Sequence, residues 1–282
     1  MTEKTKAYMA GIMDGDGCFM VARGNHGSYV NYRPLICFTN GSRPLLEWAV
    51  KHFGGCLHRQ KAHLSTNGYV SKELFHWRLY GRTSVRSFLA SLIPYLMEKK
   101  QQAQLLLDYV NLEGRNVPSE RETIYLRLRE MKQSGCVTTD TLNDSKTSHA
   151  YLAGIMDTEG HLSLFRTPQG CYNNRIGITN SFRPVLEAAN YLYGGGIAPV
   201  GNKKGKPCSV WYISNRKTIE SCLLQTLPYL VAKRSQALCM LDFVRAENRE
   251  KQDIAYGKMI ESKIQSELTS DRKSVLSETA AT

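Results

Sequence analysis

The chain contains two copies of one domain, and this internal repeat limits its possible folds more than any other feature. Residues 7–17 read AYMAGIMDGDG, and residues 150–160 read AYLAGIMDTEG. Two further blocks recur in the same order: TNGSRPLLE (39–47) returns as TNSFRPVLE (179–187), and PYLMEK (94–99) returns as PYLVAK (228–233). The offset falls from 143 to 140 and then to 134, and small changes of this kind are accommodated in surface loops. The sequence therefore predicts one fold built twice.

The repeat divides the chain into an N-terminal half at residues 1–114 and a C-terminal half at 148–268. We expect the stretch between them, 115–147, to be a linker. Its first part has the apolar spacing of a helix, and its second part is rich in Thr, Asn, Asp and Ser, which is typical of a loop. Residues 269–282 form a polar tail that we expect to fray.

Each half shows the same succession of short helices and strands. Apolar and polar residues alternate after each motif and again near 31–38, 56–63 and 73–80, which predicts β-strands with one buried face. Pro34 within one of these runs predicts an edge position or a bulge. Helices are expected at 7–13, 43–53, 83–92 and 95–112, and in the second copy at 150–156 and 183–193. The predicted class is α+β, with two pseudo-symmetric αββαββα halves and an optional extra terminal helix.

Glycines in the two motif segments support a further prediction. Gly17 and Gly160 follow the helices and suit a left-handed residue that ends a helix. Gly11 and Gly154 lie inside the helices, where glycine costs about 1 kcal/mol relative to alanine. Beside the neighbouring alanines they form a small face that lets two backbones approach closely. We therefore expect the two motif helices to pack against each other where the halves meet.

The charge of the chain favours an anionic partner. The net charge is +12, and both halves are basic: residues 1–141 hold 19 Lys+Arg and 12 Asp+Glu, and the remainder hold 18 and 13. Nucleic acid or an anionic membrane surface would fit this balance. The sequence has no run of eighteen apolar residues and no apolar secretory signal, so we expect neither a membrane span nor secretion. The eight cysteines lack zinc-site spacing and are expected to be small buried residues in a reducing compartment.

Polar side chains occupy the strand positions that alternate with the apolar core residues. Such side chains contact base edges and phosphates in DNA complexes, although a solvated sheet face remains the alternative for each of them. The candidate DNA-binding residues in the first half are Asn31, Arg33, His76, Arg78 and Tyr80. Those in the second half are Ser163, Asn173, Arg175, Lys203, Lys204, Tyr212 and Ser214.

Two acids at the ends of the motif helices are the candidate chemical groups. If the helices pack side by side, their C-terminal ends bring Asp16 and Glu159 close together. Two carboxylates at helix ends that carry partial negative charge repel each other unless a cation is present. Mg²⁺ prefers oxygen ligands, and acids that hold it beside a phosphate can support phosphodiester hydrolysis. The alternative, that these acids are merely polar helix ends, stays open at this point.

The motif segments resemble those of a known family. MAGIMDGDG (9–17) and LAGIMDTEG (152–160) are similar to the two motifs of single-chain LAGLIDADG homing endonucleases, and the downstream blocks extend the resemblance over nearly the whole chain. It implies an intron-encoded, Mg²⁺-dependent DNA endonuclease, active as a monomer, that cuts a long asymmetric site and leaves short 3′ overhangs. Mn²⁺ is expected to replace Mg²⁺, and Ca²⁺ to bind without supporting cleavage.

The same resemblance implies a fold and a set of residue roles. The fold is a saddle of two antiparallel sheets in the DNA major groove, with the motif helices at its centre. The implied metal ligands are the carboxylates of Asp16 and Glu159 and the carbonyls of Gly15 and Thr158, while Asp14 and Asp157 are more structural. The implied catalytic set contains both ligand acids, Asn40 and Asn180 after the second strand, and Lys99 and Lys233 after the Pro-Tyr-Leu blocks.

Other functions fit the same scaffold. An intron RNA maturase or a non-cleaving DNA-binding regulator is the main alternative, and intron RNA would then be a partner. The presence of both acids and both lysines favours the nuclease. A protein-interaction module fits poorly with the charge of +12. The expected location is intracellular, in a bacterial cytoplasm, a mitochondrion or a chloroplast.

Overall fold

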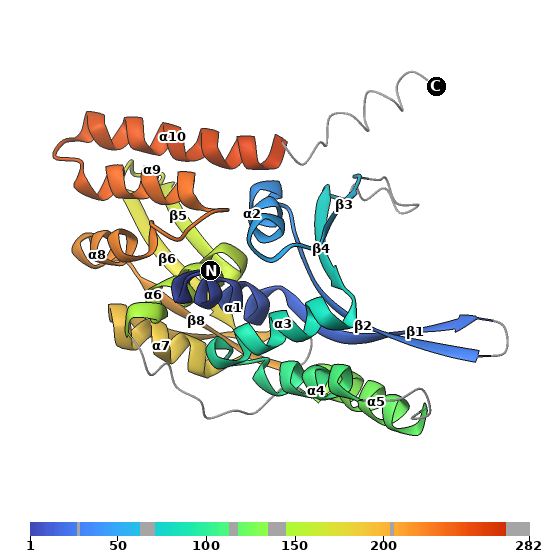
Figure 1. The fold of residues 1–282 in the computed structure, drawn as a ribbon. Coiled ribbons are helices and arrows are strands. Elements are labelled where there is room, and N and C mark those ends of the chain that lie inside the picture. Colours follow the sequence, from blue (N-terminus) through green and yellow to red (C-terminus); the bar gives the residue numbers. More distant parts are fainter. Residues whose placement is uncertain (27–28, 63–70, 113–117, 135–144, 204–205, 269–282) are drawn as a thin grey trace, which may run out of the picture.

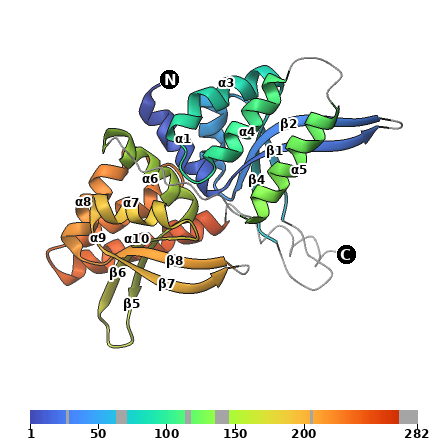
Figure 2. The ribbon, with the colours of Figure 1, turned by 90° about the horizontal axis from the view of Figure 1, so that it is seen from below.

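The computed structural model describes residues 1–282 except 27–28, 63–70, 113–117, 135–144, 204–205 and 269–282. Within the described residues the chain forms ten α-helices, one short 3-10 helix and two four-stranded sheets. Two halves with the same order of elements lie on either side of a central helix pair, α1 (Glu3–Gly15) and α6 (Ser145–Glu159), as Figures 1 and 2 show. This arrangement confirms the predicted α+β fold of two pseudo-symmetric halves.

The two halves repeat one succession of elements. After α1, the first half contains β1 (Gly17–His26), β2 (Tyr29–Asn40), α2 (Arg43–Phe53), β3 (Cys56–Gln60), β4 (Leu74–Tyr80), α3 (Arg82–Leu92), the 3-10 turn η1 (Ile93–Tyr95), α4 (Lys100–Asn111) and α5 (Pro118–Ser134). After α6, the second half contains β5 (Gly160–Arg166), β6 (Tyr172–Asn180), α7 (Arg183–Tyr193), β7 (Gly196–Lys203), β8 (Lys206–Ile213), α8 (Arg216–Thr226), α9 (Arg234–Arg245) and α10 (Arg249–Leu268).

Both sheets are antiparallel and share one strand order, β1-β2-β4-β3 in the first half and β5-β6-β8-β7 in the second. One face of each sheet is buried against helices, because every second strand residue is apolar. This confirms the predicted alternation. The buried residues of these faces include Phe19, Ile36, Phe38, Phe75, Trp77, Ile176, Ile178 and Trp211.

Pro34 lies in an inner strand but at a residue paired on one side only, which agrees with the predicted edge position. β2 pairs with β1 on one side and with β4 on the other. Pro34 pairs with Val21 of β1, and the ladder to β4 begins only at the next residue, Leu35. The proline therefore stands where β2 has a partner strand on one side only, and its missing N–H removes no bond from the ladder to β4.

The central helices pack backbone against backbone. A Cβ built on Gly11 would lie 2.1 Å from the carbonyl oxygen of Tyr151, and one built on Gly154 would lie 2.2 Å from that of Tyr8. Only glycine leaves room for this approach. The residues that line both helices are fully buried over two turns or more, so the pair forms the centre of the core. The predicted packing of the motif helices is confirmed.

The ends of the motif helices differ from the prediction. The helices end at Gly15 and Glu159, two and three residues beyond 13 and 156, and neither Gly17 nor Gly160 is among the glycines with positive φ. These glycines are required for another reason: a Cβ on Gly17 would lie 2.4 Å from the Met13 carbonyl oxygen, and one on Gly160 would lie 2.5 Å from that of Met156. The strand that follows each helix therefore turns back tightly against the helix's own last turn.

The helix predicted at 95–112 is interrupted. The turn η1 ends at Tyr95, Leu96 is extended, and α4 begins only at Lys100. Pro94 lies within this turn and cannot continue a regular helical ladder. The break frees the backbone N–H groups of residues 97 and 99 for partners outside the helix, and these partners belong to the functional site.

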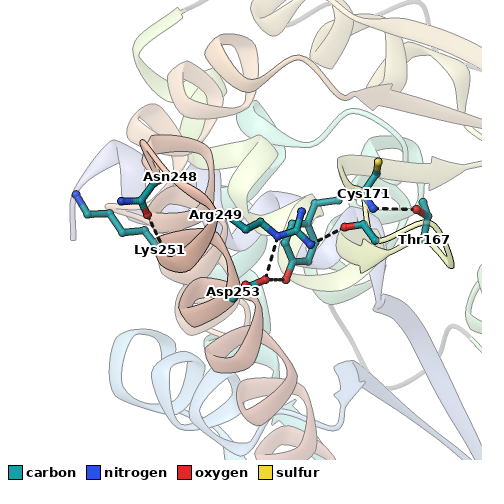
Figure 3. Close-up of polar contacts among 8 residues, drawn as sticks. Thr167, Cys171, Asn248, Arg249, Lys251 and Asp253 are labelled. Carbon is teal, nitrogen blue, oxygen red and sulfur yellow. Dashed lines mark hydrogen bonds and ion pairs between the residues drawn. The ribbon is translucent and has the colours of Figure 1, made fainter.

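The last helix of each half is tied to the sheet in the same way. The hydroxyl of Tyr32 donates to Glu122 of α5, and that of Tyr172 donates to Asp253 of α10. Figure 3 shows Arg249 beside Asp253. Nε of Arg249 lies 3.3 Å from Oδ1 of Asp253, and its guanidinium lies 4.2 Å from the centre of the Tyr172 ring. The helix in the stretch expected to be a linker therefore packs as α10 does.

The remaining expectations concern cysteines and membranes. All seven cysteines within the described residues are free thiols, and Cys208 and Cys222 are buried as expected. Cys56 and Cys171 are exposed, which corrects the expectation that the cysteines are buried. Among the described helices, none is both long and apolar enough to cross a membrane.

Candidate functional site

Two acids stand where the central helices end. Asp16 is the C-terminal cap of α1, and Glu159 is the last residue of α6. The helices stay in contact to these ends, because a Cβ on Gly15 would lie 2.1 Å from the hydroxyl oxygen of Thr158. Both carboxylates act electrostatically on the same buried ammonium group, that of Lys233. The structure thus brings one acid from each half to a shared site.

A second pair of acids locks the two halves together. Asp14 and Asp157 are buried, and each accepts a hydrogen bond from a tyrosine of the opposite helix. The Tyr151 hydroxyl lies 2.7 Å from Oδ2 of Asp14, and the Tyr8 hydroxyl lies 2.5 Å from Oδ2 of Asp157. Sequence reasoning missed these tyrosines, although both motif segments begin Ala-Tyr. The repeated tyrosine was the available signal.

The buried acids also hold the loops that carry the lysines. Asp14 accepts from the backbone N–H groups of Met97 and Lys99, at 2.8 Å each. Asp157 accepts in the same way from Val231 and Lys233, at 2.7 and 2.8 Å. Burial raises the pKa of the Asp14 carboxyl, and the two N–H groups and the Lys99 charge oppose this shift. Each loop that interrupts a helix is therefore anchored to the end of a central helix.

Replacing Tyr151 with phenylalanine should destabilise the fold by about 1–3 kcal/mol, because a buried carboxylate loses a hydrogen-bond donor. Urea unfolding followed by circular dichroism would measure the change in the free energy of unfolding. Tyr191→Phe is the matched control, since Tyr191 is 88% exposed and should change stability little. Equal stability of the two variants would contradict the proposed role of the tyrosine.

The two lysines occupy equivalent places but make different contacts. Lys99 Nζ donates to the carbonyl oxygens of Met13, Gly15 and Gly17, at 2.9 Å each. Lys233 Nζ donates to the carbonyl of Asp157 at 2.6 Å. Positive charge at a helix C-terminus offsets the partial negative charge of its carbonyls. Burial lowers the pKa of Lys233, and the neighbouring carboxylates oppose this shift.

The two asparagines also differ. Asn40, at the end of β2, donates from Nδ2 to Oδ2 of Asp16 at 2.8 Å, and its Oδ1 accepts from the Ser42 N–H at 2.9 Å. The orientation of the Asn40 amide is therefore fixed by bonds at both its nitrogen and its oxygen. Asn180 is buried, and its Oδ1 accepts from the Phe182 N–H at 2.7 Å. Sequence equivalence of the two copies thus does not make the two sides of the site identical.

The acids at this site suit a hard divalent cation. No group of three or more His, Cys, Asp or Glu side chains that could hold a metal occurs among the described residues. Asp16 and Glu159 would supply two carboxylates, and Mg²⁺ is usually held by one or two carboxylates together with water and substrate phosphates. The carbonyl of Gly15, implied as a third ligand, accepts from Lys99 Nζ. The donor set therefore fits a Mg²⁺ ion whose coordination is completed by a phosphate ligand.

In the first half, the polar strand residues lie together on the sheet face opposite the core. Asn31 and Arg33 come from β2, and His76, Arg78 and Tyr80 come from β4. His76 joins three strands, because Nδ1 shares a hydrogen bond with Thr39 Oγ1 (2.7 Å) and Nε2 shares one with Gln60 Oε1 (2.9 Å). Burial and the Arg78 charge lower the pKa of His76.

In the second half, the corresponding face carries Ser163, Asn173, Arg175 and Tyr212. The guanidinium of Arg175 lies 4.1 Å from the centre of the Tyr212 ring. Ser214 lies just beyond the end of β8. Lys204 lies outside the described residues, and of Lys203 the structure describes only its place at the end of β7.

Sequence reasoning also missed a pair of residues beside the acids. His161, two residues after Glu159, lies opposite Gly177, and a Cβ on Gly177 would come within 2.4 Å of the His161 ring. The equivalent pair in the first half is Cys18 and Cys37, which also lie opposite each other. The repeat alignment was the available signal, because it places an imidazole over a glycine in one half and two thiols in the other.

Comparisons with known proteins identify the fold. No protein-family model matches the chain, and no curated protein matches it. Among solved structures, the LAGLIDADG homing endonuclease I-GzeII in complex with its DNA target matches with a TM-score of 0.69 and 14% identity, over 92% of this chain and 96% of that one. I-SmaMI bound to an uncleaved DNA target in the presence of calcium ions matches with a TM-score of 0.64 and 16% identity, over 90% and 97%.

A third structure, the I-LtrWI LAGLIDADG homing endonuclease bound to target DNA, has a TM-score of 0.60 and 16% identity, over 93% of this chain and 97% of that one. In each case nearly the full length of both chains is matched. The chain therefore has the fold of the LAGLIDADG homing endonucleases, with both repeats in one polypeptide.

Proposed function

We propose that this chain, which has the fold of the LAGLIDADG homing endonucleases, is a site-specific DNA endonuclease. The observation that carries the proposal is the meeting of Asp16 and Glu159, one acid from each half, at the end of the helix pair between the two sheets. Three solved structures of this fold contain DNA targets. The net charge of +12 fits a polyanionic partner.

The polar faces of the two sheets would lie in the major groove on either side of the central helices. β-ribbons fit this groove, and it presents a distinct pattern of donors and acceptors for each base pair. Because the two faces carry different residues, the half-sites they read should differ. The target is therefore expected to be long and asymmetric, whereas a symmetric homodimer would need a near-palindrome.

The residues around the acids position them for hydrolysis. A Mg²⁺ ion held by Asp16 and Glu159 would stabilise the charge that develops on the phosphate during attack by water. Asn40 fixes the orientation of the Asp16 carboxylate through the bond from its Nδ2. Lys99 and Lys233 bind carbonyls at the ends of the central helices, where their charge lets two carboxylates stay close. Each acid is expected to serve one DNA strand.

Cleavage of a randomised duplex library in Mg²⁺ would test the proposal. We expect cuts within one long sequence, with short 3′ overhangs at the sequenced ends, and no cuts in the presence of excess EDTA because the paired acids need a cation. Mn²⁺ should support cleavage, and Ca²⁺ should support binding alone. Retention of one sequence without any cut would instead favour a maturase or a binding regulator. Cleavage that survives EDTA would refute the metal-dependent site.

We further propose that a single chain is the active species, since both acids belong to one polypeptide. The initial cleavage rate should therefore rise linearly with protein concentration when DNA is in excess. Sedimentation of the chain with one DNA duplex should give a 1:1 complex. A rate that rises with the square of the protein concentration would show that two chains are needed.

A further inference from the structure

Two apolar side chains and the ring of a tyrosine form a row across the otherwise polar face of the first sheet. Met20 of β1 lies opposite Leu35 of β2, and Leu35 lies opposite Tyr80 of β4. Their neighbours along the strands, such as Phe19 and Ile36, point into the core, so this row belongs to the other face. Met20 and Leu35 are half-buried, and Tyr80 is 44% exposed.

The equivalent row of the second sheet is polar. The repeat offsets of 143, 140 and 134 place Ser163, Arg175 and Ser214 at the positions of Met20, Leu35 and Tyr80. Ser163 and Arg175 lie opposite each other across β5 and β6. Ser214 follows the last residue of β8. The two halves therefore present contrasting chemistry at one pseudo-symmetric place.

Arg175 is held in position by its neighbours. Its guanidinium lies 4.1 Å from the centre of the Tyr212 ring, and Tyr212 lies over Gly196, where a Cβ would come within 3.2 Å of the phenol. Stacking on an aromatic ring limits the freedom of the guanidinium plane. The buried Nε of Arg175 has no hydrogen-bond partner among the described residues. A fixed guanidinium plane suits a planar ligand that offers two acceptors.

We infer that the Arg175 row reads a guanine and that the Met20–Leu35–Tyr80 row reads a thymine at the pseudo-symmetric position of the other half-site. Arginine contacts O6 and N7 of guanine through two hydrogen bonds, whereas apolar side chains contact the thymine methyl group. This inference rests on the proposed function, because it places DNA against both faces. It predicts a defined departure of the target from a palindrome.

Selection of bound duplexes from a randomised library, in metal-free buffer so that no cleavage occurs, would test the inference. The wild-type chain should select a motif with guanine at one position and thymine at the position related to it through the centre of the site. Arg175→Ala should lower discrimination at the guanine position by roughly tenfold and leave the other positions unchanged, because one bidentate contact is lost. Leu35→Ala should weaken only the thymine preference.

Two further variants separate base reading from general charge. Arg175→Lys keeps the charge but loses the planar pair of donors, so it should retain affinity and lose discrimination at the guanine position. Arg183→Ala, which removes a charge from helix α7 on the core side of the sheet, should leave the motif unchanged. A uniform loss of affinity in Arg175→Ala would assign Arg175 to phosphate contact and overturn the inference. A motif with the same base at both positions would also overturn it, whereas the absence of any motif would overturn the proposed function itself.

Discussion

Asp16→Asn should abolish double-strand cleavage while DNA binding stays close to that of the wild-type chain. The substitution keeps the size of the side chain and removes one of the two carboxylates proposed to hold Mg²⁺. A bound metal supplies several kcal/mol of charge stabilisation in the transition state. Each 1.4 kcal/mol corresponds to a factor of ten in rate, so we expect a loss of roughly a thousandfold. Cleavage of a labelled target duplex, with binding measured in parallel, would check this.

Glu159→Gln should have the same effect, because the two acids belong to one site. The double variant should be little worse than either single variant, since residues that act as a unit show strongly non-additive effects. Glu247→Gln is the matched control: this carboxylate is exposed, lies between α9 and α10 far along the chain from the motif, and pairs with Lys251 of α10. A double variant that still cleaves at the wild-type rate would contradict the assignment of Asp16 and Glu159 to the active site.

Asp14→Asn should reduce stability as well as cleavage, and this distinguishes the structural role of Asp14 from the catalytic role of Asp16. The Asp14 carboxylate accepts hydrogen bonds from Met97, Lys99 and Tyr151. In asparagine one of the two accepting oxygens is replaced by an NH₂ group, which is itself a donor and cannot accept these bonds. We therefore expect a loss of stability, with an unfolding transition at lower urea, in addition to lost cleavage. Asp16→Asn should unfold at the same urea concentration as the wild-type chain.

The sequence predicted most of the architecture because the repeat and the alternation of apolar residues act locally. Each strand needs only its own period of two to show which face is buried, and residues such as Ile36, Trp77 and Trp211 follow that rule. The paired glycines of the motif helices predicted their packing for the same reason. A glycine inside a helix needs an explanation, and close approach of another backbone supplies it.

The parts that could not be predicted depend on contacts between residues distant in the chain. The break after Tyr95 looks helical in sequence, and it becomes understandable only once Asp14 is seen to accept the N–H groups of Met97 and Lys99. The tyrosine bonds join residues 137 and 149 positions apart. Likewise, α5 has the composition of a linker helix, and its place in the first half is seen only from long-range contacts such as the burial of Leu128 and the bond between Tyr32 and Glu122.

The sequence repeat also did not predict the differences between the two copies of the site. Asn40 and Asn180 occupy the same place in the repeat. The observed bond from this pair to an acid of the site is the one from Asn40 to Asp16, at 2.8 Å. Lys99 binds three carbonyls at and just beyond the end of α1, and the observed bond of the Lys233 ammonium is to the single carbonyl of Asp157 in α6. Pattern alone treats such residues as equivalent, because packing around them is set by neighbours that the repeat does not preserve.

Gly11→Ala should be among the most destabilising single substitutions in the chain. The added Cβ would lie 2.1 Å from the Tyr151 carbonyl oxygen, 3.0 Å from the Ile155 nitrogen and 3.0 Å from the Tyr151 carbonyl carbon, and all three atoms are backbone of the facing helix. A flexible side chain could move aside, but a helix backbone moves only as a whole. Gly154→Ala meets the same obstacle, because its Cβ would lie 2.2 Å from the Tyr8 carbonyl oxygen.

The expected loss of stability for Gly11→Ala is about 3 kcal/mol, at the upper end of the usual cost of overpacking a core. The control is Gly257→Ala in α10, where an added Cβ meets no heavy atom within 4 Å. That variant should gain about 0.5–1 kcal/mol, because alanine favours the helix interior. Urea unfolding of both variants would give opposite signs. A Gly11→Ala chain as stable as the wild type would show that the helices can separate without cost, and the shared site at their ends would then lose its structural basis.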